Sequence, residues 1–146
     1  MSPIPQEIIR FLENQTCASI CGVDENASPY CFSCFYAFHA DNGLLYFKSS
    51  PSVHHSLILK QNPKVAGTIL PDKLRTMQVQ GLQFTGTLLP PEDPLAQAAS
   101  KKYHLRFPFA LVMGGDVWTI RFDTIKMTDS TKLPGRKTKW ERSEMM

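Results

Sequence analysis

The stretch ADNGLLYFKSSPSVHHSLILKQNP, residues 40–63, indicates the class of fold. Asp41-Asn42-Gly43 is a strong tight-turn signal between two apolar runs, which we predict as antiparallel strands. A helix is predicted from Pro51 to Gln61, because Ser50 suits the N-cap, proline suits the first helical position and Asn62-Pro63 ends the pattern. The stretch therefore reads as a β-hairpin that leads into a helix.

Outward from this stretch, the chain continues mainly as strands. The apolar parity of the last predicted strand slips by one residue near Asp123-Thr124, which indicates a bulge. Asp93 is the expected N-cap of the third helix. The order predicts a mainly β fold, a largely antiparallel six-stranded barrel with about three helices. Strands are predicted at 16–23, 30–40, 44–48, 64–70, 77–89 and 117–128, and helices at 5–14, 51–61 and 94–107.

The composition is that of a globular domain. Hydrophobic residues make up 42% and charged residues 20% of the 146 residues, and the net charge of +3 is too small to suggest nucleic-acid binding. No apolar run is long enough to span a bilayer and no secretory signal is visible, so we expect no membrane partner and a cytoplasmic location. Residues 1–130 are predicted as one domain, and 131–146 as a basic tail that is either solvated or crosses to a partner subunit.

The four cysteines, Cys17, Cys21, Cys31 and Cys34, are expected to be reduced thiols. Cys31 and Cys34 are three residues apart on a strand and therefore face opposite sides, which does not suit a metal site. A hairpin centred on Asn26 would place Cys21 opposite Cys31. Buried thiols are the favoured interpretation, and metal or thiol chemistry at Cys21 and Cys31 is the alternative.

The serines and histidines after the third strand allow two interpretations. Free N–H groups at a helix N-terminus, the hydroxyls of Ser49 and Ser50, and His55 together could bind a phosphate. His54 points about 100° away around the helix and cannot serve the same ligand equally. By itself, the pattern favours the plainer interpretation, in which Ser50 only caps the helix.

Five stretches stand out: FYAFHADNGLLYF (35–47), KVAGTI (64–69), GLQFTG (81–86), KKYHLRFP (101–108) and VWTIRFDTIKMTD (117–129). Together with the order of elements, they resemble the pyridoxamine-phosphate-oxidase-like, FMN-binding split-barrel superfamily. Within it, the chain resembles a small, functionally uncharacterised bacterial branch typified by the Escherichia coli YhbP protein. The resemblance covers nearly the whole chain, although none of the stretches is diagnostic alone.

The resemblance implies a split-barrel homodimer with two FMN sites at the subunit interface, and it favours the phosphate interpretation. His55 stands where the family usually has lysine or arginine, so the phosphate site lacks a permanent positive charge on that helix. Trp118, like Trp140, is a candidate for contacting the cofactor from the other subunit, but it suits the core equally well. The implied cofactor-binding residues are Ser49, Ser50 and His55 at the phosphate, Ser33, Cys34, Phe35, Tyr36 and Gln83 at the ring, and Trp140 from the other subunit.

The function implied is that of an FMN-dependent oxidoreductase of unknown substrate, with NAD(P)H or a small molecule as its redox partner. No catalytic residue is identifiable, because the flavin itself carries out the electron transfer. The alternative is a dimer that binds flavin or haem without turnover, or one that has lost its cofactor. The tail TKLPGRKTKWER (131–142) lacks the arginine-rich substrate segment of pyridoxamine phosphate oxidases, so vitamin B6 oxidation is not predicted.

Overall fold

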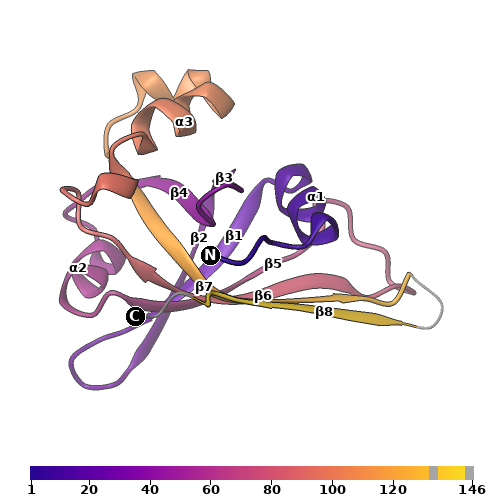
Figure 1. Cartoon of the computed structure of the whole chain (residues 1–146). Helices are drawn as coiled ribbons and strands as arrows, with labels where there is room; N and C mark the ends of the chain where they lie inside the picture. The colour runs from indigo at the N-terminus through magenta and orange to yellow at the C-terminus, as the bar shows by residue number, and fades with distance from the viewer. Residues whose placement is uncertain (132–134, 144–146) are drawn as a thin grey trace.

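Eight strands form one curled antiparallel sheet in the computed structural model, which describes residues 1–131 and 135–143 (Figure 1). Their order is β2-β1-β5-β6-β7-β4-β3, and β8 pairs with β7 beside β4. The prediction of a mainly β, antiparallel fold is confirmed, whereas the predicted number of six strands is too low. The strands are β1 (Cys17–Val23), β2 (Pro29–Phe35), β3 (Ala37–His39), β4 (Leu44–Ser49), β5 (Lys64–Ile69), β6 (Gln80–Leu88), β7 (Asp116–Asp129) and β8 (Arg136–Glu141).

The described residues also form three α-helices and two short 3-10 helices. Helix α1 packs its apolar face, formed by Ile8, Phe11 and Leu12, into the main core. In Figure 1, α1 lies beside β1 and β3, whereas α3 lies off the sheet beyond β4. Among the described residues, none of these helices has the length and apolar character needed to cross a bilayer. The helices are α1 (Gln6–Asn14), α2 (His54–Gln61), η1 (Pro94–Ala96), α3 (Ala99–Arg106) and η2 (Pro108–Val112).

The long strand β7 organises the sheet. One of its edges pairs with β6, and its other edge pairs first with β4 and then with β8. Opposite β6, the register passes from Thr124 to Phe122 and skips Asp123. The bulge predicted from the slip in apolar parity is therefore confirmed, and it keeps apolar side chains directed to the core on both sides of the irregularity.

The predicted strand 30–40 is two strands that meet at Tyr36. Strand β2 pairs with β1, whereas β3 pairs with β4, so the chain changes partners at this residue. The Tyr36 N–H donates to the carbonyl of Thr16 (3.1 Å), and its carbonyl accepts from Arg106 Nη1 (3.1 Å). The first bond continues the β1–β2 pairing and the second comes from α3, so the chain changes strand partners at Tyr36 without leaving its buried backbone groups unpaired.

The third helix begins later than predicted. Asp93 is the N-cap as expected, because its Oδ1 accepts from the Leu95 N–H (2.9 Å). The capped segment is only the 3-10 turn η1, and α3 begins at Ala99. Pro108 follows α3 and opens η2, so the apolar segment after α3 folds back as a separate turn.

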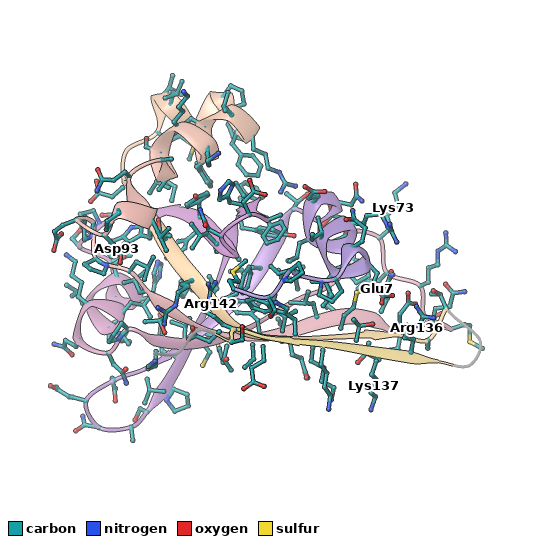
Figure 2. All side chains as sticks on the ribbon, in the orientation of Figure 1. Glu7, Lys73, Asp93, Arg136, Lys137 and Arg142 are labelled. Carbon is teal, nitrogen blue, oxygen red and sulfur yellow. The ribbon has the colours of Figure 1, made fainter. Side chains whose placement is uncertain are left out.

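Part of the predicted basic tail is strand β8. Glu7 on α1 accepts hydrogen bonds from Thr138 Oγ1 (2.9 Å) and Arg136 Nη1 (3.4 Å) of β8. Figure 2 shows Glu7 and Arg136 near one another, while Lys137 points to the opposite side of β8. The tail segment 136–141 is therefore paired within this chain, and its positions 132–134 and 144–146 lie outside the described residues.

Candidate functional site

A hydrogen-bonded pair of polar side chains lies at the end of β4. Ser49 is the last residue of this strand, and its Oγ lies 2.7 Å from His55 Nε2 on the first turn of α2. The imidazole of His55 stacks on the ring of Phe32, with centroids 3.7 Å apart and planes 8° from parallel. The turn between β4 and α2 therefore delivers one hydroxyl and one imidazole to the same place, as the phosphate interpretation requires.

Partial burial keeps His55 neutral. Loss of solvent lowers its pKa from the usual value of 6.5, and the neighbouring His54 lowers it further. His54 itself lies edge-on to Tyr30, with ring centroids 4.7 Å apart, and takes no part in the pair. The helical geometry that separates the two histidines thus leaves one imidazole for the site.

Helix α2 begins three residues later than predicted. It starts at His54 with Val53 as its N-cap, so Ser50 is not a cap and Pro51 is not helical. Instead, Ser50 Oγ accepts from the Ser52 N–H (3.3 Å), and the Ser50 carbonyl accepts from Ser56 Oγ (2.7 Å). The hydroxyl of Ser50 therefore shapes the turn rather than the Ser49–His55 pair.

The backbone around Ser49 is held from the side of β7. Trp118 Nε1 donates to the Ser49 carbonyl (3.0 Å). Gly115 has φ +116°, and a Cβ there would lie 3.1 Å from the Ser49 carbonyl carbon. A glycine is required at this point both for the positive φ and for the close approach of the two backbones.

Lys48 is a residue of this region that the sequence analysis missed. Its Nζ donates to the Ala110 carbonyl (2.6 Å) and to His104 Nε2 (3.0 Å). His104 accepts at Nε2 because its Nδ1 donates to the Ser100 carbonyl (2.8 Å). Strand alternation places Lys48 on the face opposite Ser49, and only the fold-back of α3 and η2 brings both residues to one cleft.

A cleft of ≈ 440 Å³ lies where the β1–β2 hairpin, the end of β4, the start of α2 and the η2 segment meet. Both apolar and polar groups line it. The aromatic or apolar lining includes Tyr103, Phe109 and Met113, and Lys48 adds an ammonium group. Five residues of the predicted cofactor site line the cleft, namely Ser33, Cys34, Phe35, Ser49 and His55.

Other predicted site residues lie elsewhere. Tyr36 is fully buried, its hydroxyl donates to the Leu12 carbonyl (2.5 Å), and burial raises the pKa of its phenol. Gln83 lies on the outer face of the sheet beside a broad hollow. Trp140 is 6% exposed, and its Nε1 donates to the Ser2 carbonyl (3.0 Å). Within this chain, these three side chains are therefore separate from the cleft.

The thiol of Cys34 lines the cleft but is not a nucleophile at neutral pH. Burial raises its pKa to about 12. Cys17, which also lines the cleft, has a raised pKa because of burial and the nearby Asp72 carboxylate. Both sulfur atoms therefore contribute shape and polarisability to the cleft rather than charge.

The sequence is similar to bacterial proteins of one family along nearly all its length. A UPF0306 protein of Photorhabdus laumondii subsp. laumondii is 32% identical over 137 residues, which are 94% of this chain and 95% of that protein. A UPF0306 protein of Haemophilus ducreyi is 32% identical over 146 residues, covering 97% of this chain and 98% of the relative. The chain belongs to the UPF0306 family. No family model matches this UPF0306 sequence.

Solved structures with low sequence identity share the UPF0306 fold. A haem-binding protein from Mycobacterium smegmatis has a TM-score of 0.75 at 15% identity, and the alignment covers 97% of this chain and 59% of that longer one. A pyridoxamine 5'-phosphate oxidase-related, FMN-binding protein from Nostoc punctiforme has a TM-score of 0.70 at 12% identity, covering 99% and 93%. The haem storage protein HutZ from Vibrio cholerae has a TM-score of 0.62 at 16% identity, covering 83% and 89%.

These comparisons confirm the predicted fold class, the split barrel of the pyridoxamine-phosphate-oxidase-like type. They also place the UPF0306 chain among small bacterial proteins. The narrower likeness to the Escherichia coli YhbP protein stays a prediction. Because the fold neighbours include proteins described as binding FMN and proteins described as binding haem, the fold alone does not assign the cofactor.

Proposed function

We propose that this chain binds FMN in the cleft between β2, Ser49 and His55, and that the bound flavin serves a redox reaction on a small-molecule substrate. One observation carries the proposal. Residues 33–35, Ser49 and His55, which are separate in the sequence, converge on one cleft whose lining combines hydrogen-bonding groups with aromatic rings. A planar cofactor with an anionic tail needs both kinds of group.

The polar groups of the cleft fit a phosphate. Ser49 Oγ and His55 Nε2 supply two hydrogen-bonding groups 2.7 Å apart, and the first N–H groups of α2 have no partner within the helix. Lys48 Nζ adds the permanent charge that His55 lacks. In this proposal, Ser49 and His55 hold the phosphate and Lys48 contributes its positive charge.

The edge of β2 suits the ring. Strand β2 is the last strand at one side of the sheet order, so its second edge has no partner strand among residues 1–131 and 135–143. Two hydrogen bonds show which residue pairs of the β1–β2 hairpin are hydrogen-bonded pairs. They run from Tyr36 N–H to Thr16 O (3.1 Å) and from Asp24 N–H to Ser28 O (3.0 Å). Alternation then directs the backbone N–H and C=O of Ser33 and Phe35 away from β1. These groups are the ones we assign to the polar edge of the isoalloxazine ring.

Bound FMN would supply the hydride or electron transfer, and this chain would supply orientation and a water-poor wall. Phe35 stacks on Phe107, with centroids 5.6 Å apart, which gives the wall a fixed aromatic surface. The FMN-binding fold neighbour from Nostoc punctiforme supports this choice of cofactor.

The proposal is tested by titrating the purified protein with FMN and recording its absorption and fluorescence. We expect His55→Gln to weaken binding and His54→Gln to leave it unchanged, because only His55 reaches the cleft. No binding by the unaltered protein, or equal effects of the two variants, would refute the assignment.

The redox part has a separate test. We expect NADH or NADPH to reduce protein-bound FMN faster than free FMN. Equal rates for bound and free flavin, with binding intact, would leave a flavin-binding protein without turnover.

Exposed apolar side chains border the cleft. Large apolar side chains beside the cleft are exposed: Phe35 by 48%, Phe109 by 60%, Met113 by 58% and Val112 by 91%. We propose that a second copy of the chain covers this surface and completes the FMN site. Light scattering should then give a dimer, which Val112→Asp converts to a monomer with weaker FMN binding. Met77→Asp is the matched control, because Met77 is 92% exposed at a different part of the surface.

Haem binding is the second candidate, and the lining of the cleft favours it specifically. His55 offers a neutral imidazole, the form that binds haem iron, beside the apolar Phe109 and Met113. Two fold neighbours are described as haem proteins. A sharpened and shifted Soret band on addition of haem, with the shift lost in His55→Gln but retained in Ser49→Ala, would favour haem over FMN.

A further inference from the structure

Two cysteines face each other on the outer side of the β1–β2 hairpin. The register pairs Cys21 directly with Cys31, and both line a broad hollow of ≈ 840 Å³ on the outer face of the sheet. This hollow is separate from the cleft at Ser49 and His55, and the FMN proposal makes no use of either thiol.

The hydrogen-bond pattern of the hairpin determines how close the two residues are. Thr16–Tyr36 at one end of the hairpin and Asp24–Ser28 at the other are hydrogen-bonded pairs. Between them, hydrogen-bonded and non-hydrogen-bonded pairs alternate along the two strands. In this alternation, Cys21–Cys31 is a non-hydrogen-bonded pair. Non-bonded antiparallel pairs have Cα atoms about 4.5 Å apart, with their side chains on the same face. Disulfides form across Cα separations of about 4.4–6.8 Å, so no backbone movement is required to join the two sulfurs.

The thiols already interact and are accessible. A hydrogen bond to the Cys21 thiol is the largest cause of the raised pKa of Cys31. Cys31 is exposed and Cys21 is partly exposed, and the nearest outward neighbours, Ser19 and Ala66, are small. A small oxidant therefore has access to the pair from the hollow.

The other two cysteines lack this arrangement. Cys17 pairs with Phe35, and Cys34 pairs with Ala18. Cys34 also faces inward, and burial raises its pKa to about 12. They provide an internal control, since they lie on the same hairpin without a cysteine opposite them.

We propose that Cys21 and Cys31 form a reversible intramolecular disulfide, a redox modification site on the outer face of the sheet. With a peroxide as oxidant, the thiolate of one cysteine attacks a peroxide oxygen and becomes a sulfenic acid, while the other oxygen leaves and is protonated to water. The second thiol then displaces the sulfenic oxygen, which leaves as a second water. Two thiols and one hydrogen peroxide thus give one disulfide and two waters.

The geometry also favours easy reduction. Cys31 is exposed, and exposed disulfides are among the more readily reduced ones. The site therefore has the character of a reversible switch rather than of a structural crosslink. A dithiol reductant should restore both thiols.

The test is thiol counting and mass spectrometry on the full chain after treatment with one equivalent of hydrogen peroxide. We expect the loss of two of the four thiols and a mass lower by two hydrogens. Cleavage after Glu25 separates Cys21 from Cys31, so the two fragments should stay joined until a reductant is added. Retention of all four thiols, or oxygen addition without joined fragments, would overturn the proposal.

Variants identify the partners. Cys31→Ser should abolish the joined fragments, whereas Cys17→Ser should retain them. Circular dichroism of each variant before oxidation establishes that the fold is intact, and the result with the unaltered chain stands even where a variant fails to fold. FMN titration is a separate measurement, so failure of the flavin proposal and failure of this one are distinguishable.

Discussion

Replacing Ser49 with alanine tests whether the phosphate site is the cleft or the serine-rich turn that follows it. The Ser49 hydroxyl lies 2.7 Å from His55 Nε2, whereas the Ser50 hydroxyl interacts with Ser52 within the turn. The sequence treats the two adjacent serines as equivalent, but the structure assigns only the first to the cleft. Ser50→Ala is therefore a control that differs by a single position.

The expected magnitude follows from the hydrogen bond that is lost. A hydrogen bond to a charged group contributes about 1.5–3 kcal/mol, which corresponds to about a tenfold to 150-fold weaker binding of FMN in Ser49→Ala. In the absence of ligand, loss of the neutral Ser49–His55 bond should lower the free energy of unfolding by only about 0.5–1.5 kcal/mol.

The assay is quenching of FMN fluorescence during titration with each variant, together with urea unfolding of the free protein. We expect Ser50→Ala to bind FMN within about twofold of the unaltered chain, since a difference of that size is below 0.5 kcal/mol. Equal losses in Ser49→Ala and Ser50→Ala would refute the placement of the phosphate in the cleft. A loss in Ser50→Ala alone would favour the turn.

Three further outcomes are expected. Gly67→Ala should destabilise the chain by at least about 1–3 kcal/mol in urea unfolding, because its Cβ would overlap a phenylalanine ring of β6 and a carbonyl of β1, whereas Gly114→Ala, with nothing within 4 Å, should have little effect. Tyr36→Phe should cost about 1–3 kcal/mol, since it leaves a buried carbonyl of α1 without its donor, and the exposed Tyr30→Phe should be neutral. The pKa of His55 is lowered in the folded chain, so the unfolded chain takes up the proton first and stability should fall as the pH drops below 6.5; this part of the pH dependence should be absent in His55→Gln.

Several features were readable from the sequence because they depend on neighbouring residues alone. The one-residue slip of apolar parity located the bulge at Asp123 in β7. Asp93 was recognisable as an N-cap because its side chain reaches a backbone N–H only two residues away. In each case, the controlling contact lies within a few residues along the chain.

Other features were wrong or missed because they depend on distant contacts. The break at Tyr36 depends on Thr16 and Arg106, which are remote in the sequence. Strand β8 was predicted as tail because its basic, alternating sequence has no apolar run, and its pairing with β7 and its bonds to Glu7 are visible only in the fold. Lys48 was overlooked because alternation directs it away from Ser49.

The sequence by itself determined the antiparallel β class and the bulge in β7, since these arise from side-chain periodicity, whereas the Ser49–His55 pair rested on the family resemblance. Only the tertiary structure decided which residues share a cleft. It placed Ser33 and Phe35 at a sheet edge beside that pair, and it brought Lys48 to the same place through η2. It also separated Tyr36, Gln83 and Trp140 from the cleft. The physical reason is that local sequence sets the backbone geometry of each segment, whereas burial and satisfaction of polar groups across the whole chain decide which segments meet.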